Sequence, residues 1–242
     1  MKTGTLYGIG VGPGDSELIT VKGARLIGES EHIFVPKARI KTESIALQIA
    51  REYISETAEI HEQIFPMTPD RDELERCWDE SALEVLEVLA DGKAACFLTI
   101  GDPLLYSTYI YLVRRLRANE PEVNIVTVPG IMALNAAAAL TDFALGEGKE
   151  SVTILPTADD LDAAAKALDK TGTVVLMKIG KRLPAILDLL EEKGVLDSSV
   201  FIAKAGQDDQ VIETDLAKLR GGGSETGYLS IILTHVNKEG RS

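Results

Sequence analysis

The 242-residue sequence predicts an α/β protein built from two successive halves. Apolar runs of strand length alternate with helix-length amphipathic segments along the whole chain, which is the pattern of α/β folds. Three of these runs end abruptly in turn signals, at Pro13-Gly14-Asp15, Gly101-Asp102-Pro103 and Val128-Pro129-Gly130. Ligands bind beyond the carboxyl ends of strands in open α/β sheets, so these turns predict a binding site at one sheet edge.

The first half is expected to contain strands at 5–11, 32–35 and 94–99, one ending at Val128, and a short extended piece at 60–65. Residues 16–27 predict a helix that begins at Ser16 or Thr20, because either side chain can act as N-cap. Further helices are expected at 44–54, at 70–90 and up to about residue 117, the last with Ser107 or Thr108 as its cap. In the helix at 70–90, apolar residues share one face, so the single tryptophan, Trp78, is expected to pack there.

A polar connection at 119–122 predicts a boundary between domains at 1–122 and 123–242. The second half repeats the alternation. Strands are expected at 151–155, 173–177, 200–203, 210–213 and 228–234, and helices at 135–140, 159–169, 183–193 and 215–219.

Composition narrows the classes of partner. A formal net charge of −13 disfavours nucleic acid and anionic membranes, and no apolar run is long enough to span a bilayer. The first residues lack the apolar core of a signal peptide, which predicts a cytoplasmic protein. Cys77 and Cys96 lack metal-ligand spacing and are expected to be reduced thiols in the core. His32, His61 and His235 are scattered and are interpreted as structural, so no protein-bound metal is expected.

The first glycine-rich turn does not fit the common nucleotide-binding motifs. If Gly8 and Gly10 began a G-x-G-x-x-G fingerprint, its third glycine position would be Pro13; if Gly10 and Gly12 began it, that position would be Asp15. No G-K-[S/T] follows, which excludes a P-loop. Taken alone, the turn is compatible both with simple chain reversal and with ligand binding.

Taken together, these segments resemble the tetrapyrrole methylase family, whose members are S-adenosylmethionine-dependent methyltransferases with two α/β domains. The family motifs G-x-G-P-G-D, G-D-P and V-P-G-[I/V] match residues 10–15, 101–103 and 128–131, and an apolar-Met strand end matches 176–177. Residues 6–15, 35–38, 65–67 and 101–108 are most similar to the branch that methylates C20 of precorrin-2 or cobalt-factor II in cobalamin biosynthesis. A different family branch, or a non-catalytic nucleotide-binding module, is the alternative.

The resemblance implies a homodimer and a folded S-adenosylmethionine donor bound in the cleft between the domains. It implies no residue for catalytic proton transfer, and Asp102 is expected to bind the donor unless it only caps its own turn. The matching positions implied for donor binding are Pro13, Gly101, Asp102, Leu105, Ser107, Thr108, Ile131, Met132, Ala133, Met177, Ala205 and Gly206.

The acceptor implied by the resemblance is a reduced tetrapyrrole, which carries several carboxylates. A protein of net charge −13 should repel such a molecule unless local cations hold it. Lys37 and Arg39, followed by Lys41, lie in a segment without acids, and Lys178 follows a second-half strand. Lys37, Arg39 and Lys178 are therefore the expected acceptor-binding residues.

Overall fold

A computed structural model describes residues 3–37, 43–66, 68, 70–157, 161–221 and 227–236. The chain divides into two compact units, of which the first ends at Met132 and the second begins at Ala133. Each unit has its own sheet and its own hydrophobic core. The two units are described separately.

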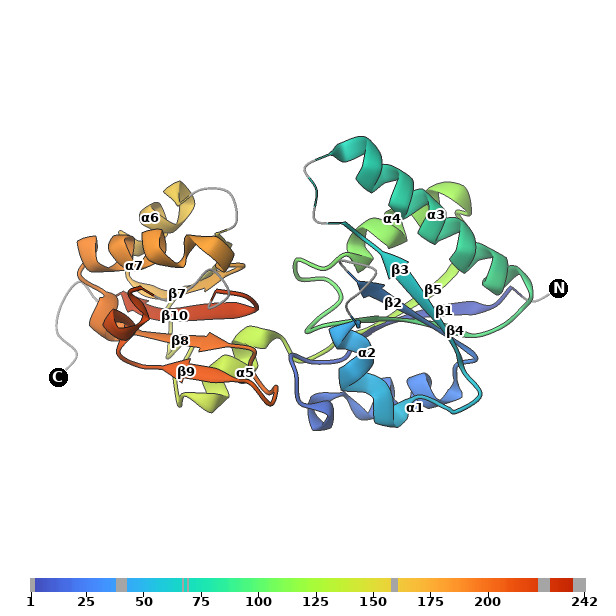
Figure 1. Cartoon of the computed structure of the whole chain (residues 1–242), viewed down its shortest axis with the longest axis horizontal. Helices are drawn as coiled ribbons and strands as arrows, with labels where there is room; N and C mark the ends of the chain where they lie inside the picture. The colour runs from blue at the N-terminus through green and yellow to red at the C-terminus, as the bar shows by residue number, and fades with distance from the viewer. Residues whose placement is uncertain are drawn as a thin grey trace. The chain divides into compact units, whose positions relative to one another are not determined.

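The first unit is built on a five-stranded parallel sheet with the strand order β3-β2-β4-β1-β5 (Figure 1). Parallel neighbours require crossover connections, and helices supply them here. Because every strand points the same way, the carboxyl ends of all five strands lie at one edge. The strands are β1 (Thr5–Gly10), β2 (His32–Lys37), β3 (Glu59–Ile64), β4 (Ala95–Thr99) and β5 (Asn124–Val128).

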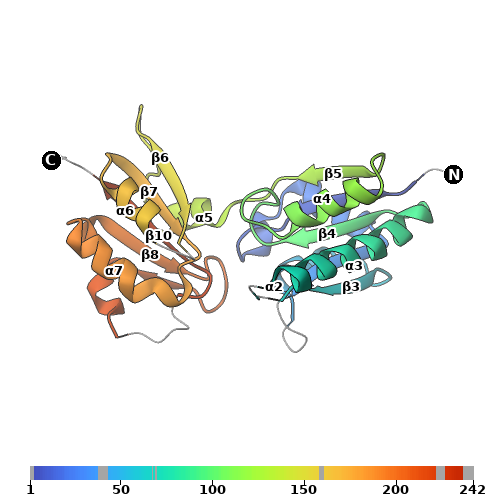
Figure 2. The same cartoon turned by 90° about the horizontal axis from the view of Figure 1, so that it is seen from above.

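Helices cover both faces of this sheet. The shorter pair, α1 (Val21–Glu29) and α2 (Ile45–Ala50), packs on one face, and the pair α3 (Arg71–Ala90) and α4 (Tyr109–Asn119) packs on the other. Figure 2 shows α3 and α4 side by side, and Trp78 of α3 stacks on Tyr111 of α4 with ring centroids 4.6 Å apart. Trp78 therefore packs within the apolar face of its helix.

The start of α1 differs from one of the two expected positions. Thr20 is the N-cap, since its Oγ1 accepts a hydrogen bond from the Gly23 N–H at 3.1 Å. Ser16 instead begins a separate 3-10 turn, η1 (Ser16–Leu18), whose own cap is Asp15. The expected helix at 44–54 is likewise divided, because α2 ends at Ala50 and is followed by η2 (Arg51–Tyr53).

Gly8 makes room for the largest fully buried side chain of the first unit. A Cβ on Gly8 would overlap the ring of Tyr109, which lies fully buried across β1. The Tyr109 hydroxyl forms a hydrogen bond with Thr127 Oγ1 of β5 at 2.9 Å. Burial raises the pKa of the Tyr109 hydroxyl, so this group stays neutral and joins α4 to the sheet.

The second unit contains a mixed sheet with the order β6-β7-β10-β8-β9. The β6–β7 pair is parallel and the remaining pairs are antiparallel. Because β10 runs against both β7 and β8, the carboxyl ends of β7 and β8 lie at one edge beside the start of β10. The strands are β6 (Val152–Pro156), β7 (Gly172–Met177), β8 (Ser199–Ala203), β9 (Val211–Glu213) and β10 (Ser230–Val236).

Two helices, α6 (Asp162–Leu168) and α7 (Leu183–Glu192), share one core with this sheet, and α5 (Ala133–Leu140) contacts β10. Short 3-10 turns complete the unit, namely η3 (Gly180–Arg182), η4 (Leu196–Ser198) and η5 (Leu216–Leu219). Among the described residues, none of the helices is both long and apolar enough to cross a bilayer.

The end of the first unit lies beyond the expected boundary at residue 122. Residues Asn124–Val128 form β5, which pairs in parallel with β1 over Thr5–Ile9. The polar connection at 119–122 therefore joins α4 to a strand of the same sheet, and the first unit continues to Met132. A polar linker within one sheet and a polar linker between domains have the same composition, so sequence alone did not separate them.

Candidate functional site

Three loops meet at the carboxyl edge of the first sheet, and we call residues 11–15, 100–108 and 129–132 the N-terminal loop cluster. The Gly101 N–H donates to the Gly12 carbonyl at 2.8 Å, which joins the loops after β1 and β4. A Cβ on Gly10 would overlap the Gly101 carbonyl oxygen and lie 2.7 Å from the Gly130 Cα. A Cβ on Gly130 would overlap the same oxygen. At these glycines the loops approach backbone to backbone, which leaves no room for a side chain.

Asp102 connects two of these loops through its carboxylate. Oδ1 accepts from the Leu104 N–H at 2.8 Å, within the turn that follows β4. Oδ2 accepts from the Gly130 N–H at 3.1 Å, in the loop that follows β5. Asp102 thus caps its own turn, as the structural alternative expected, and in addition holds a second loop.

The other predicted donor residues of this cluster differ in accessibility. Ser107 is buried, where its Oγ forms a hydrogen bond with Thr99 Oγ1 at 2.9 Å and accepts from the Tyr109 N–H at 3.1 Å. Thr108 is the N-cap residue of α4, although its side chain makes no capping hydrogen bond. Pro13 is buried, Leu105 and Met132 are half-buried, and Ile131 is 37% exposed.

Apolar side chains next to these residues face solvent. Leu104 is 63% exposed and Tyr106 is 38% exposed, in the same loop as Leu105. Apolar surface on a backbone that is fixed by glycine contacts and by Asp102 is suited to a flat or apolar ligand.

The second unit has a corresponding set of loops, and we call residues 177–180, 204–206 and 227–229 the C-terminal loop cluster. Met177 ends β7 opposite Ile231, and Ala203 ends β8 opposite Ser230, so the residues that follow both strands lie at one edge. The Lys204 N–H donates to the Leu229 carbonyl at 3.0 Å, and the Gly180 N–H donates to the Gly227 carbonyl at 2.9 Å. This edge therefore brings together three loops that are far apart in sequence.

The predicted donor residues of the second unit are small or half-buried. Ala205 is buried, and the Gly206 N–H donates to Gln210 Oε1 at 2.7 Å. Met177 is half-buried, and Ala133 is the first residue of α5.

Backbone strain gathers in the two loop clusters. Tyr106, Lys178, Lys204 and Leu229 have φ of 54°, 57°, 53° and 49°, in the left-handed region that side chains disfavour. Among the described non-glycine residues, only Asp142 shares this property outside the clusters. Strained backbone persists where the surrounding structure enforces it and concentrates at ligand sites. Sequence reasoning missed this signal, because none of these residue types favours a positive φ.

The basic residues predicted to bind the acceptor lie in different surroundings. Lys37, at the end of β2, forms an ion pair with Glu62 of β3, and its side chain is only 8% exposed. Its charge is therefore neutralised by a carboxylate from the adjacent strand. Arg39 and Lys41 lie outside the described residues. Lys178 is exposed in the C-terminal loop cluster.

The histidines are not all scattered, contrary to expectation. His32 Nδ1 and His61 Nε2 lie 2.9 Å apart, because β2 and β3 are paired although the residues are 29 positions apart in sequence. The pKa of His32 is lowered by burial first and also by the charges of Lys93 and His61. His235 lies in the second unit, stacked on Phe143 at 4.0 Å, and burial lowers its pKa as well.

The chain matches a family model and several named relatives. The model for tetrapyrrole (corrin/porphyrin) methylases matches residues 5–220. The chain is 33% identical over 202 residues to the cobalt-precorrin-2 C(20)-methyltransferase of Salmonella typhimurium, with 84% of each chain covered. It is 35% identical over 209 residues to a probable cobalt-precorrin-2 C(20)-methyltransferase of Methanocaldococcus jannaschii, with 82% of this chain and 87% of the relative covered.

Solved structures share the fold. An X-ray structure of a cobalt precorrin-4 methyltransferase superposes with a TM-score of 0.72 at 23% identity, covering 96% of this chain and 94% of that one. A uroporphyrin-III C-methyltransferase from Thermus thermophilus, complexed with S-adenyl homocysteine, gives 0.65 at 18% identity, covering 96% and 92%. From the family match and the two relatives above 30% identity, we conclude that the chain belongs to the tetrapyrrole methylase family.

Proposed function

We propose that this protein is an S-adenosylmethionine-dependent methyltransferase that methylates C20 of precorrin-2 or of its cobalt form in cobalamin biosynthesis. The observation that carries the proposal is the similarity to two C(20)-methyltransferases over 84% and 82% of the chain. Each loop cluster supplies a candidate binding surface at the edge of its own sheet.

The donor-binding part of the proposal rests on the loop clusters. A sulfonium methyl group is already activated, so the protein mainly has to hold donor and acceptor in line and exclude water. Orientation of this kind contributes about 7–11 kcal/mol. We assign donor binding to residues of both clusters and to Ala133, which directly follows the N-terminal loop cluster. The residues are Pro13, Gly101, Asp102, Leu105, Ser107, Thr108, Ile131, Met132, Ala133, Met177, Ala205 and Gly206.

Within this assignment, the residues have different tasks. Asp102 fixes the Leu104 and Gly130 loops, so that backbone groups of both are preorganised. Ile131, exposed beside them, supplies apolar surface for the donor. Lys178 is proposed to bind an acceptor carboxylate, and no residue is assigned to accept the C20 proton.

The proposal extends to the state of the protein. The donor carries its own leaving group, so we propose that methyl transfer needs no protein-bound metal. The family resemblance supports a homodimer. Cys77 and Cys96 are both free thiols, which supports a reducing compartment such as the cytoplasm.

The decisive experiment supplies methyl-labelled donor with either precorrin-2 or its cobalt form as acceptor. We expect one labelled methyl group per product, located at C20 by nuclear magnetic resonance. A methyl group at another ring position would place the protein in a different branch of the family. Donor binding without transfer to either acceptor would favour a nucleotide-binding module.

A matched pair of variants tests the donor surface. Ile131→Glu places a charge in the N-terminal loop cluster, whereas Leu83→Glu places one on the exposed face of α3, where Leu83 is 59% exposed. We expect the first variant to weaken donor binding in calorimetry and the second to leave it unchanged. Equal binding by both variants would remove Ile131 from the site.

A further inference from the structure

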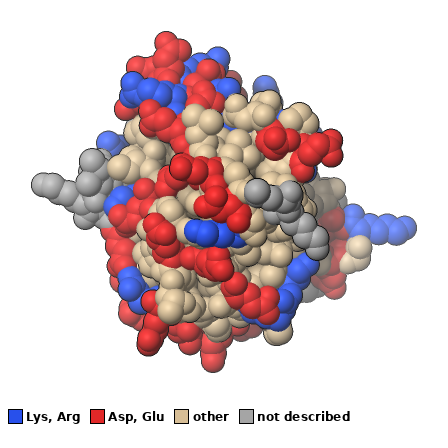
Figure 3. Space-filling view, turned by 90° about the vertical axis from the view of Figure 1, so that its right-hand side faces the viewer, with Lys and Arg blue, Asp and Glu red and all other residues tan. Residues whose placement is uncertain are grey.

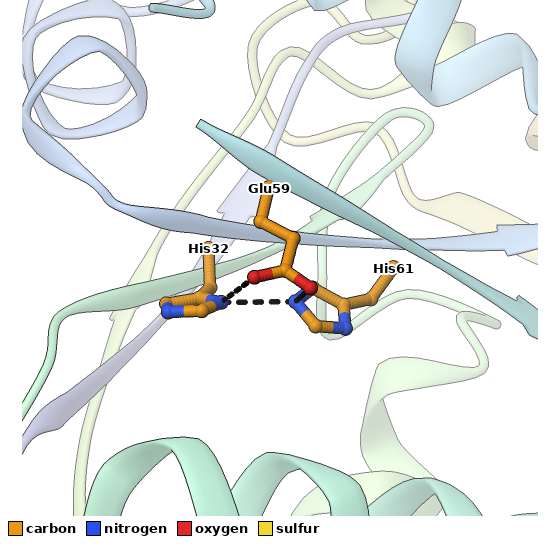
Figure 4. Close-up of side chains that lie close together, drawn as sticks. All are labelled: His32, Glu59 and His61. Carbon is orange, nitrogen blue, oxygen red and sulfur yellow. Dashed lines mark hydrogen bonds and ion pairs between the residues drawn. The ribbon is translucent and has the colours of Figure 1, made fainter. Parts of the chain in front are cut away.

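Three ligating side chains converge at the amino ends of β2 and β3, far from the glycine loops. His32 begins β2, and Glu59 and His61 lie on β3, with their ligand atoms all within 4.8 Å of one another. Figure 4 shows the Glu59 carboxylate between the two imidazole rings. His32 Nδ1 lies 3.6 Å from Glu59 Oε2, His61 Nε2 lies 3.9 Å from Glu59 Oε1, and the two nitrogens are 2.9 Å apart.

These separations suit a single tetrahedral ion. Zinc binds imidazole nitrogen and carboxylate oxygen at about 2.0–2.2 Å, which places neighbouring ligand atoms about 3.3–3.6 Å apart. The two nitrogens, 2.9 Å apart, are closer than this range, and the 3.6 Å from His32 Nδ1 to Glu59 Oε2 lies at its upper end. The 3.9 Å from His61 Nε2 runs to the other carboxylate oxygen, Oε1. Small side-chain rotations would bring both nitrogens and one oxygen of Glu59 to bonding distance of one ion.

A further carboxylate orients the His61 ring. His61 Nδ1 lies 2.7 Å from Glu84 Oε1 on α3, so that Nδ1 carries the proton and Nε2 presents its lone pair toward His32 and Glu59. Glu84 is itself held, because the Gln63 amide donates to its Oε2 at 3.4 Å. The Phe34 ring stacks on His61 at 4.4 Å and fixes its plane. A carboxylate behind a ligating histidine is the usual outer partner in metal sites.

Accessibility and charge also favour a cation. The histidine side chains are 8% and 13% exposed, whereas Glu59 is 67% exposed and leaves the site open to solvent. Glu31, Glu59 and Glu84 surround the pair, and Lys93 is the opposing charge. Figure 3 shows the end of the first unit near the N-terminus, where acidic side chains cover much of the face.

We propose that His32, Glu59 and His61 form a site for a divalent transition metal of the zinc type, with Glu84 as its outer-sphere partner. Water would complete the coordination. This proposal departs from the expectation, drawn from sequence, that the protein binds no metal. Two histidines and one carboxylate are ligands that zinc accepts readily, and their spacing across two strands hid them from sequence motifs.

The position of the site indicates a structural role. His32 is level with Ala95 of β4, whereas Thr99, where β4 ends beside the glycine loops, is about 13 Å farther along the strand. β3 is the edge strand of its sheet. An ion held by β2 and β3, with Glu84 of α3 behind it, would fasten this edge strand to the remainder of the unit.

The test is titration of the chelator-treated full-length protein with Zn²⁺ by calorimetry and with Co²⁺ by visible absorption. We expect one ion per chain, the visible bands of four-coordinate Co²⁺, and a melting temperature that rises with Zn²⁺ concentration. His61→Gln and Glu59→Gln should each weaken binding at least tenfold, and Glu84→Gln should weaken it by about 10–100-fold. His235→Gln, in the second unit, is the matched control and should bind as the wild type does.

Glu59→Gln keeps the test valid if a histidine variant fails to fold, because the Glu59 side chain is mostly exposed. Absence of Zn²⁺ binding in the wild type would overturn the proposal, as would affinities unchanged in both Glu59→Gln and His61→Gln. Methyl transfer is not a readout here, so the result is independent of the proposed enzymatic function.

Discussion

The Asp102 carboxylate holds the Gly130 backbone, with Oδ2 accepting from the Gly130 N–H at 3.1 Å while Oδ1 accepts from the Leu104 N–H. Leu104 and Gly130 directly precede Leu105 and Ile131, two of the predicted donor-binding residues. One side chain therefore fixes the backbone in front of both. Truncation removes both bonds, whereas an amide replaces one acceptor oxygen with a donor group that cannot accept.

We accordingly expect Asp102→Ala to lower the free energy of unfolding by about 1–3 kcal/mol. Asp102→Asn should lower the free energy of unfolding by less. Both variants should bind donor more weakly, because the two loops lose their relative positions. Urea unfolding and calorimetry measure the two effects. Asp91→Asn, at an exposed acid near Lys93, is the control, and donor affinity unaltered by Asp102→Ala would show that the loops hold without the carboxylate.

Gly8 offers a test of close packing in the first unit. Gly8→Ala places a Cβ against the buried ring of Tyr109, and we expect a loss of at least about 1–3 kcal/mol from overpacking. Gly28→Ala is the matched control, because the nearest atom to its added Cβ is the Tyr53 carbonyl oxygen at 3.4 Å and the residue lies in α1. Helix propensity favours alanine there by up to about 1 kcal/mol. Equal stability of the two variants in urea unfolding would contradict the packing argument.

The two thiols should differ in reactivity. Burial raises the pKa of Cys96 to about 12, so its thiolate is scarce at neutral pH, and its Sγ lies 2.9 Å from Ser30 Oγ. Cys77, on α3, is only partly buried, although burial and Glu80 also raise its pKa. We expect a disulfide reagent to label Cys77 first in the native protein and both thiols in urea. Cys77→Ser should abolish the native signal, and rapid native labelling of that variant would refute the assignment.

His235 gives a pH dependence of defined sign. Burial lowers the pKa of its folded form below 6.5, so the unfolded chain binds more protons in the interval between the two values. The contribution of His235 to the free energy of unfolding is therefore fully present above pH 6.5. It falls as the pH drops toward the lower folded pKa, by at most about 1.4 kcal/mol per pH unit. His235→Gln should lose less stability than the wild type over this interval in urea unfolding. Parallel pH profiles for the two proteins would rule out the effect.

Lys178 and Lys37 should separate acceptor binding from structure. Lys178→Gln is expected to raise the acceptor KM and leave kcat nearly unchanged, as loss of uniform binding does. Lys181→Gln, in η3 close by, is the control. Lys37→Gln should instead lower stability, since it breaks the ion pair with Glu62 without touching the acceptor. A KM effect from Lys37→Gln alone would reverse these roles.

The sequence predicted the fold well because alternation and turn chemistry are local properties. Strand ends at Gly10, Thr99 and Val128 follow from apolar runs that stop at glycine or proline. The predicted donor residues lie in the two loop clusters or directly beside them. Whether they bind the donor stays a prediction.

What sequence reasoning missed depends on contacts between distant residues. The Asp102–Gly130 bond joins residues 28 apart, and the Lys37–Glu62 pair joins residues 25 apart. The segment around Lys37 contains no acid of its own, so it was interpreted as a basic patch. Its partner comes from the next strand, which a linear reading does not place beside it. The His32–His61 pair escaped attention for the same reason.

The stacking of Trp78 on Tyr111 has a practical consequence for spectroscopy. Trp78 is the single tryptophan of the chain, and it lies between α3 and α4 in the first unit. Its fluorescence therefore reports the melting of that unit alone, while far-ultraviolet ellipticity reports both. A difference between the two signals on heating would show, without labels, which of the two units unfolds first.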